Sequence, residues 1–275
     1  MTRLCMGVPS WPNHAQIFAD LELEAVPFDH ANADGTADLD AVLRAIRAAG
    51  PDEGVLLHGC CHNPTGIDYR PQEWERIAEA FEASGAFPII DIAYQGLGRG
   101  LEEDASGLRK VLSKVPEAFI AYSCDKNFGM YRDRVGAFYI LCDGTEMLDK
   151  AFSNANALAR ASWSMPPDHG AAAVRLILRD NELTQMWQDE LDEMRARMRQ
   201  VRDRLAEAGM AGSVDLAPLA AQNGLFSMLP VTKEQVVKLR EEHAIYMAGS
   251  GRINVAGLTT GNIDRFIDAL AAVTG

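Results

Sequence analysis

The sequence predicts an α/β protein with a mostly parallel sheet flanked by helices, followed by a smaller α+β domain at the C-terminal end. Three observations lead to this prediction. Short apolar runs alternate with amphipathic segments over the first half of the chain, and helical periodicity takes over after Pro166 and Pro167. The length of 275 residues is enough for one large domain and a second, smaller one.

Four short apolar runs of the first half are predicted as buried strands, at 54–58, 87–92, 118–122 and 135–141. Amphipathic segments are predicted as helices, at 39–49, 71–83 and 105–112. Pro71 suits the first turn of the second helix, where its missing N–H costs nothing. Strands that alternate with helices favour a parallel sheet with helices on both faces, and such sheets bind ligands beyond the carboxyl ends of their strands.

The second half begins with one long helix, because apolar residues recur every three or four positions from Leu183 to Leu205. We expect this helix to end near Gly209, since glycine commonly follows the last helical turn. The Met and Trp side chains of its apolar stripe are interpreted as core.

The C-terminal segment is predicted to contain both strands and helices. Strand-like pieces lie around Phe226 and Ile253, a Thr-x-x-Gln capping box begins a helix at Thr232, and another helix follows at 262–273. We therefore predict two domains that share the long helix: a large domain at 1–194 and a small C-terminal domain at 195–275.

Charge and cysteine content restrict the function. The net charge of −13 argues against nucleic-acid binding, which depends on clustered Lys and Arg. The five cysteines form neither a disulfide framework nor a CxxC metal pair, and no signal peptide or membrane-spanning run is recognisable, so a cytoplasmic protein without a membrane partner is expected. No metal site is predicted at His58, Cys60, Cys61 and His62, because no second ligand pair accompanies them.

Polar clusters follow or close three of the predicted strands, at 62–66 (HNPTG), 91–96 (DIAYQG) and 123–129 (SCDKNFG). Because the carboxyl ends of parallel strands meet at one edge of a sheet, we expect the three clusters to lie together. Asp91 closes an apolar run, where an ionised carboxylate is costly to bury without a donor or a cation. Each cluster taken alone is also compatible with ordinary loops and helix caps.

Taken together, the strings HNPTG, DIAYQG and KNFGMYRDRVG resemble the aspartate and aromatic amino acid aminotransferases, a class I family of fold type I enzymes that depend on pyridoxal 5'-phosphate (PLP). The strings PSWPNH, RASWSMPPDHG and SGRINVAGL extend the resemblance over the whole chain. The resemblance implies that 1–194 is a PLP-binding large domain. It also implies that the family's N-terminal region is lacking, with its glycine-containing phosphate loop and dimer arm.

The resemblance assigns the catalytic groups. It makes Lys126 the residue that holds PLP as an imine, and Asp91 the acid that keeps the pyridinium nitrogen protonated, so that the ring acts as an electron sink. Tyr94 is the third catalytic residue. His14, three residues after the tryptophan of SWPNH, is expected to stabilise Asp91 without contacting the cofactor itself.

Further cofactor contacts follow from the same resemblance. Asn63 and Tyr94 are expected to donate to the phenolic oxygen of PLP, and Trp11 to stack on its ring. Ser123 and Arg134, three residues before and eight after the lysine, are expected to bind the phosphate, for which the fork of an arginine is well suited. Asn63 and Trp11 are also expected to contact the substrate.

Two arginines are implied as substrate clamps. Arg252 is expected to bind the α-carboxylate, and Arg160 to reach from a neighbouring subunit to the side-chain carboxylate of a dicarboxylic substrate, which requires a homodimer. The implied reaction is a ping-pong transamination between aspartate or an aromatic amino acid and a 2-oxo acid such as 2-oxoglutarate, with Lys126 as the general base.

Two departures and two alternatives accompany this prediction. Asp125 stands where the family usually has serine, which places a negative charge near the phosphate, and Trp163 stands where tyrosine is common, next to Arg160. One alternative is a non-catalytic remnant of the fold that serves as a structural or interaction protein. The other is a PLP enzyme with a different outcome, such as β-elimination.

Overall fold

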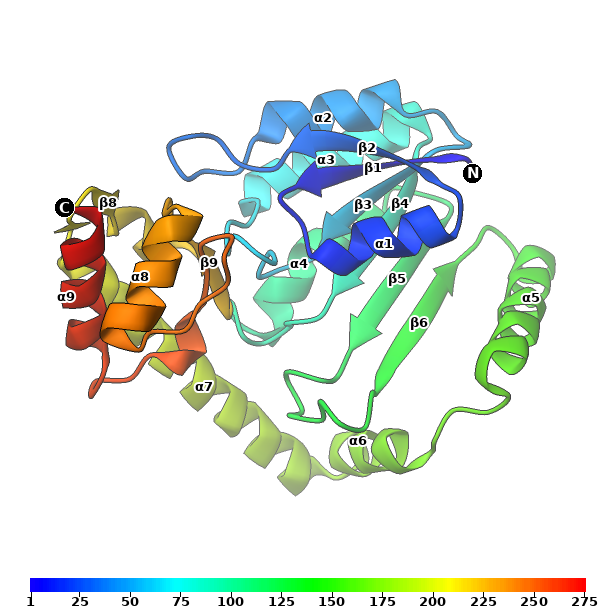
Figure 1. The fold of residues 1–275 in the computed structure, drawn as a ribbon. Coiled ribbons are helices and arrows are strands. Elements are labelled where there is room, and N and C mark those ends of the chain that lie inside the picture. The colour runs from blue at the N-terminus through cyan, green and yellow to red at the C-terminus, as the bar shows by residue number, and fades with distance from the viewer.

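The computed structural model describes residues 1–275, and a six-stranded sheet forms its centre (Figure 1). The strands lie in the order β2-β1-β3-β4-β5-β6, and every neighbouring pair is parallel except β5 and β6. Their bounds are Arg3–Val8 (β1), Glu24–Asp29 (β2), Gly54–His58 (β3), Phe87–Ile92 (β4), Ala118–Ser123 (β5) and Gly136–Leu141 (β6). The predicted fold class, a mostly parallel sheet with flanking helices, is therefore confirmed.

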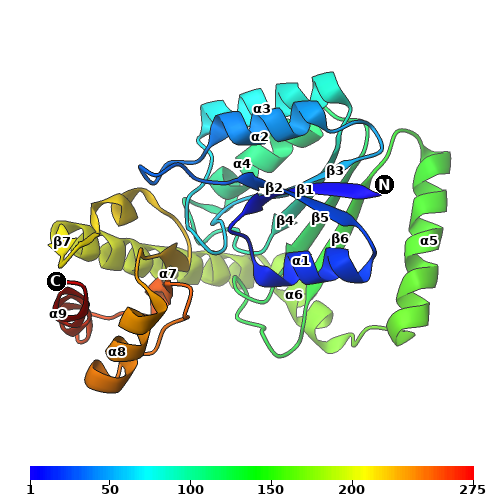
Figure 2. The same cartoon turned by 45° about the horizontal axis from the view of Figure 1, so that its top comes forward.

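Nine α-helices surround the sheet and extend from it, with α2, α3 and α4 on one face and α1 on the other (Figure 2). None of them combines the length and the apolar character that crossing a bilayer requires. Their bounds are Pro12–Asp20 (α1), Leu39–Ala48 (α2), Pro71–Ser84 (α3), Leu101–Leu112 (α4), Thr145–Trp163 (α5), His169–Arg179 (α6), Asn181–Glu207 (α7), Lys233–His243 (α8) and Ile263–Thr274 (α9).

The alternation of side chains along β1 explains why helices cover both faces. Leu4 and Met6 point to one side, where they are buried with Phe18 of α1. Cys5 points to the other side and belongs to the main core, which includes Val42 of α2. Because successive side chains of a strand face opposite ways, a strand that is apolar at every position needs a cover on each face.

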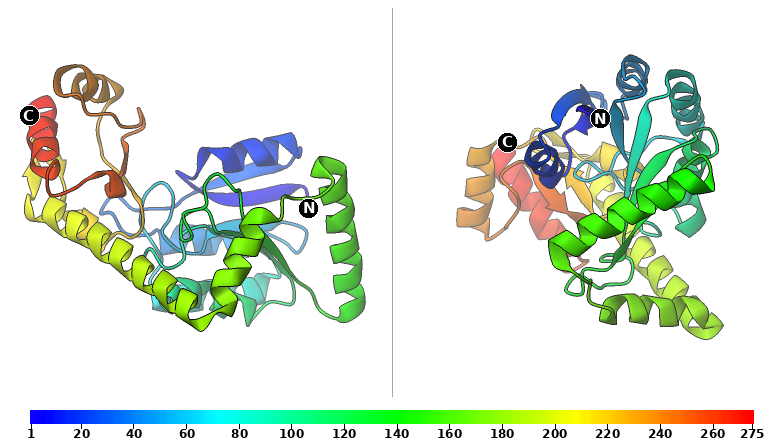
Figure 3. Two further views of the ribbon diagram at one scale, coloured as in Figure 1. Left: turned by 90° about the horizontal axis from the view of Figure 1, so that it is seen from below. Right: turned by 90° about the vertical axis from the view of Figure 1, so that its right-hand side faces the viewer.

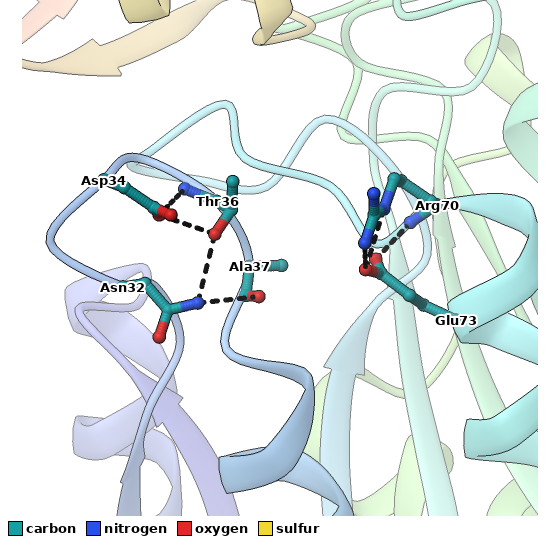
Figure 4. Close-up of polar contacts among 6 residues, drawn as sticks. All are labelled: Asn32, Asp34, Thr36, Ala37, Arg70 and Glu73. Carbon is teal, nitrogen blue, oxygen red and sulfur yellow. Dashed lines mark hydrogen bonds and ion pairs between the residues drawn. The ribbon is translucent and has the colours of Figure 1, made fainter.

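Local hydrogen bonds order the chain where it enters α2 and α3 (Figure 4). Before α2, the carboxylate of Asp34 accepts from the backbone N–H of Thr36 at 3.0 Å and from its hydroxyl at 2.6 Å. At the start of α3, the carboxylate of Glu73 accepts from the backbone N–H of Arg70 at 2.7 Å, which satisfies a donor at the helix N-terminus. These segments follow the carboxyl ends of β2 and β3.

The strand predicted at 135–141 is present, but the prediction that it is buried is wrong. β6 is an edge strand that pairs antiparallel with β5, and the side chains of Phe138 and Tyr139 are each 54% exposed. The chain returns from β5 through a loop instead of a crossover helix, so it reverses direction. α5 follows β6 without a buried residue, and Figure 3 shows it at the opposite end of the molecule from α8 and α9.

The C-terminal unit has its own core, which contains Leu239 of α8 and Leu270 of α9. It also holds β7 (Met210–Ala211) with β8 (Val214–Asp215), and β9 (Phe226–Met228) with β10 (Arg252–Asn254), both pairs antiparallel. Two 3-10 turns, Ala217–Ala221 and Val255–Gly257, complete it. α7 joins the two parts, because its Met198 packs in the main core and its Val201 in the C-terminal core. The domain division at 194/195 stays a prediction.

Candidate active site

The three polar clusters come together at the carboxyl ends of β3, β4 and β5. His58, the last residue of β3, lies opposite Asp91 of β4, and Asp91 lies opposite Ala121 of β5. The loops that follow these strands therefore leave the same edge of the sheet, as parallel pairing requires. Asn63 and Lys126 lie on these loops, so the sheet itself brings the predicted residues of separate segments into one place.

Asp91 is held by a histidine of α1. The Nε2 atom of His14 lies 3.0 Å from Oδ2 of Asp91, and His14 is buried. Burial alone would raise the pKa of Asp91, but the hydrogen bond from His14 and the positive charge of Lys126 oppose it, and the pKa lies below its usual value. Asp91 is therefore ionised at neutral pH and available as the partner of a cation.

A chain of hydrogen bonds continues from His14 into the sheet. Ser10 Oγ lies 3.1 Å from His14 Nδ1 and 3.2 Å from His58 Nε2, and His58 Nδ1 accepts from the backbone N–H of Asn63 at 3.4 Å. Burial lowers the pKa of His58 to about 3, so its ring is neutral. Since Nδ1 accepts, Nε2 of His58 carries the hydrogen and donates to Ser10 Oγ, and Nε2 of His14 donates to the ionised carboxylate of Asp91, which can only accept.

Ser10 and His58 belong to the site although the sequence analysis did not assign them to it. Ser10 immediately precedes the Trp11 of the PSWPNH string, and His58 closes a predicted strand. The register of β3 against β4 places His58 beside Asp91, and this register is known only from the structure.

Lys126 lies in the loop after β5 and is half-buried. Its Nζ atom is 5.1 Å from the ring centroid of Tyr94 and 6.0 Å from that of Tyr131. Burial lowers the pKa of Lys126, and the negative charge of Asp91 opposes this only in part. A larger share of the amine is therefore neutral at a given pH than for a lysine in solvent, which favours nucleophilic and basic chemistry.

Asn63, Tyr94 and Arg252 form a second group of contacts. Asn63 Nδ2 donates to the hydroxyl of Tyr94 at 3.3 Å, and Arg252 Nη1 donates to Asn63 Oδ1 at 3.2 Å. The guanidinium carbon of Arg252 also lies 4.6 Å from the ring centroid of Phe226. Burial, together with the charge of Asp91, raises the pKa of the Tyr94 hydroxyl, which keeps it protonated as a donor. A residue of β10 thus reaches the large-domain loops.

Of the residues predicted for the phosphate, Ser123 ends β5 and Arg134 lies in the loop that follows, and both contact Asp125. Arg134 Nη1 forms an ion pair with Oδ2 of Asp125, and the backbone N–H of Asp125 donates to Ser123 Oγ at 3.2 Å. The side chain of Arg134 is 72% exposed, whereas that of Asp125 is 2% exposed. The arginine therefore faces solvent with one of its donors already used by a buried carboxylate.

Two predicted residues are placed differently from the others. Trp11 precedes α1 and packs its ring edge-on against His14, with centroids 5.1 Å apart, while 38% of its surface stays exposed. Arg160 lies on the exposed helix α5, and the single chain does not bring it together with the other site residues.

Cys60, Cys61 and Asp104 are the one group with metal-ligand geometry, since their ligand atoms lie within 4.8 Å of one another. Both oxygens of Asp104 already accept hydrogen bonds, at 2.8–3.0 Å, from the backbone N–H groups of residues 96, 98 and 99. A hydrogen bond with Cys60 and burial raise the pKa of Cys61 well above its ordinary value. Asp104 is thus explained as a cap of the loop at 96–99, and the two buried thiols stay protonated.

Comparisons with known proteins all find aminotransferases. The family description "Aminotransferase class I and II" matches residues 2–270. The tyrosine aminotransferase of Rhizobium meliloti (strain 1021) is 47% identical over 256 residues, which are 93% of this chain and 66% of that protein. The aspartate aminotransferase of Escherichia coli (strain K12) is 42% identical over 276 residues, which are 98% of this chain and 69% of that protein.

The solved structures include a similar protein with a bound group. An aromatic-amino-acid aminotransferase from Burkholderia pseudomallei, covalently bound to pyridoxal phosphate, superposes with a TM-score of 0.94 at 36% identity, over 100% of this chain and 69% of that one. This chain therefore spans about two thirds of the length of the relatives it matches.

Proposed function

The chain belongs to the class I and II aminotransferase family, in its aspartate and aromatic subfamily, and from this membership we propose that it catalyses PLP-dependent transamination. The amino donor is aspartate or an aromatic amino acid, and the acceptor is a 2-oxo acid such as 2-oxoglutarate. The observation that carries the proposal is the half-buried amine of Lys126, whose pKa is lowered, at the sheet edge that also holds the ionised Asp91.

The donor set of the site fits PLP. Lys126 would provide the amine that holds the aldehyde, and Asp91 the carboxylate for the ring nitrogen. Asn63 donates one amide hydrogen to the hydroxyl of Tyr94, so its second amide hydrogen and the hydroxyl hydrogen of Tyr94 are available to the phenolic oxygen. When bound, PLP supplies an electron sink for the negative charge that develops at the α-carbon of an amino acid. Ser123 and Arg134 are the groups assigned to its phosphate.

Proton movement is the task of Lys126 in this proposal. Its Nζ atom takes the proton from the α-carbon as a general base, which requires the neutral amine. Burial favours that neutral form, because it lowers the pKa of Lys126. The hydrogen bonds from Ser10 through His14 keep Asp91 ionised and fixed in orientation, so the group opposite the base holds its charge during the reaction.

Substrate binding is assigned to two arginines. Arg252, held in place by Asn63 and by the ring of Phe226, has further guanidinium donors for the α-carboxylate. Arg160 is assigned to the side-chain carboxylate of dicarboxylic substrates in the site of a second subunit, and the proposed enzyme is therefore a homodimer. The exposed position of Arg160 on α5 is compatible with such a contribution.

The proposal is tested by the visible spectrum of the purified protein with added PLP. We expect an absorbance band from the bond between PLP and Lys126, and its loss in Lys126→Ala, because the amine is then absent. Lys150→Ala is the matched control, since Lys150 lies on α5 in an ion pair with Glu146. Absence of the band would contradict the proposal and favour a non-catalytic remnant, and its persistence in Lys126→Ala would show that another amine holds PLP.

Product analysis with aspartate or phenylalanine and 2-oxoglutarate then identifies the reaction. Transamination yields glutamate and a new 2-oxo acid in equal amounts. Release of ammonia instead would indicate an elimination.

A further inference from the structure

Asp125 engages the cation that the proposed function assigns to the phosphate of PLP. Its Oδ2 atom pairs with Nη1 of Arg134, and the carboxylate is buried in the loop directly before Lys126. Its second oxygen, Oδ1, is also buried and has no hydrogen-bond partner. The carboxylate therefore depends on Arg134 for the compensation of its charge, because an unpaired buried charge is costly.

Apart from this ion pair, few interactions fix the side chain of Arg134. It is mostly exposed, and its one further hydrogen bond is to the backbone oxygen of Tyr131 at 3.4 Å. A phosphate that binds Arg134 must share this guanidinium with a carboxylate that the fold keeps in contact with it. Two anions at one arginine repel each other, and the repulsion is weakly screened on the side where Asp125 is buried.

The hydroxyl of Ser123 does not offset this repulsion. It accepts from the backbone N–H of Asp125, which leaves its own hydrogen free for one phosphate oxygen. One neutral hydroxyl supplies less stabilisation than the full charge that Asp125 removes. The formal charge of the Asp125 and Arg134 pair is zero, so the pair attracts a phosphate dianion far less than a free arginine does.

We propose that Asp125 is a specificity-determining residue of the cofactor site: by occupying Arg134 it lowers the preference of this chain for PLP over pyridoxal, the same aldehyde without phosphate. The inference rests on the proposed function, because that function assigns Arg134 to the phosphate. It concerns only the anionic end of the cofactor and leaves the role of Lys126 unchanged.

The test compares PLP and pyridoxal in titrations of the visible band formed with Lys126. In Asp125→Asn, which keeps the shape and removes the charge, we expect the affinity for PLP to rise about tenfold and that for pyridoxal to stay within about twofold. Adding Arg134→Ala to Asp125→Asn should cancel the gain. Asp133→Asn is the matched control, because this acid of the same loop pairs with His169 instead.

The outcomes separate this inference from the proposed function. If both aldehydes give the band and Asp125→Asn leaves their affinity ratio unchanged, the inference is wrong and the function stands. If neither aldehyde gives a band, the proposed function is wrong, and the anion competition is measured with inorganic phosphate alone. Phosphate should then raise the melting temperature of Asp125→Asn more than that of the parent, and equal shifts overturn the inference. Asp125→Ser replaces Asp125→Asn if circular dichroism shows the latter unfolded.

Discussion

Single residues of this site act through their protonation states, and the protonation state of Asp91 depends on the side chains around it. Burial raises the pKa of Asp91, whereas the hydrogen bond from His14 and the positive charge of Lys126 lower it, and the lowering prevails. The orientation of His14 is in turn set by Ser10 and by the neutral ring of His58. The charge of one carboxylate is thus the result of at least three other side chains.

Removing the donor to Asp91 should weaken cofactor binding. In His14→Phe the burial of Asp91 is no longer opposed by this hydrogen bond, so the pKa of Asp91 rises. A hydrogen bond to a charged group contributes about 1.5–3 kcal/mol, so we expect a loss of PLP affinity of about tenfold or more, measured by titration of the visible band. His243→Phe, in the C-terminal unit, is the control, and equal affinities in both variants would count against the assigned role of His14.

The buried histidines should make the stability of the fold depend on pH. Burial lowers the pKa of His30 from 6.5 to about 4, so the folded chain binds fewer protons than the unfolded chain between these values. The contribution of His30 is complete above pH 6.5 and is lost as the pH falls toward 4, by up to about 3 kcal/mol.

The contribution of His30 is isolated by comparison with a variant. His30→Gln keeps a donor for the backbone oxygen of Ile67, to which His30 Nε2 is bonded at 2.8 Å, but cannot take up a proton. Urea unfolding at several pH values between 7.5 and 4 should show a flatter profile for His30→Gln than for the parent. Buried acids such as Asp68, whose pKa is raised, titrate in both proteins and affect both profiles alike. Parallel profiles would therefore show that His30 is not the titrating group.

At the scale of elements, α3 and α4 approach each other closely in the main core. Gly107 of α4 lies against the ring of Trp74 of α3, and a Cβ atom at this position would lie 2.4 Å from two ring carbons. Trp74 is 2% exposed and belongs to the main core. Replacing a helical glycine by alanine normally stabilises a helix, but here the packing term opposes the helix propensity.

Gly107→Ala should therefore destabilise the protein, by about 1–3 kcal/mol, because buried overpacking outweighs the gain in helix propensity. The measurement is the free energy of unfolding in urea. Gly50→Ala is the matched control, since a Cβ there meets no atom within 4 Å. An unchanged or increased stability of Gly107→Ala would mean that the two helices can separate without cost.

At the scale of the whole molecule, one face of the chain is unusually apolar. Phe138 and Tyr139 of β6 and Phe152, Leu158 and Trp163 of α5 are all exposed and border a groove of about 600 Å³ between the two elements. Exposed apolar areas of this kind commonly mark surfaces that meet another polypeptide. Arg160 lies on the same helix, which connects this surface with the proposed contribution to a second subunit.

The proposed homodimer can be tested by mixing two inactive variants. Lys126→Ala lacks the proposed base and Arg160→Ala lacks the proposed clamp, but a mixed dimer contains one site with Lys126 from one subunit and Arg160 from the other. Random pairing in co-expressed protein should restore about a quarter of the parent activity with dicarboxylic substrates, since half of the dimers are mixed and each has one complete site. Activity no greater than that of the separate variants would place Arg160 outside the partner's site.

Local signals were sufficient for much of the fold. The strands at 54–58 and 87–92 and the helices α2 and α3 lie where hydrophobic periodicity predicted them, and the capping box at Thr232 is present, with Thr232 Oγ1 accepting from Gln235 N at 3.2 Å. The elements β1, β2, α1 and α5 were not predicted. The apolar run of β1 was visible in the sequence, whereas α5 has no buried residue and so lacks the contrast between faces on which such predictions depend.

The sequence by itself therefore determined the class of fold, the motif around Lys126 and the likeness to a family, because these depend on residues that are neighbours along the chain. Only the tertiary structure decided that Ser10 bonds to His58, 48 positions further along the chain, that β6 is an exposed edge, and that Asp125 pairs with Arg134. The physical reason is that periodicity and capping act within a few residues, whereas the ionisation of a buried group depends on every element packed around it.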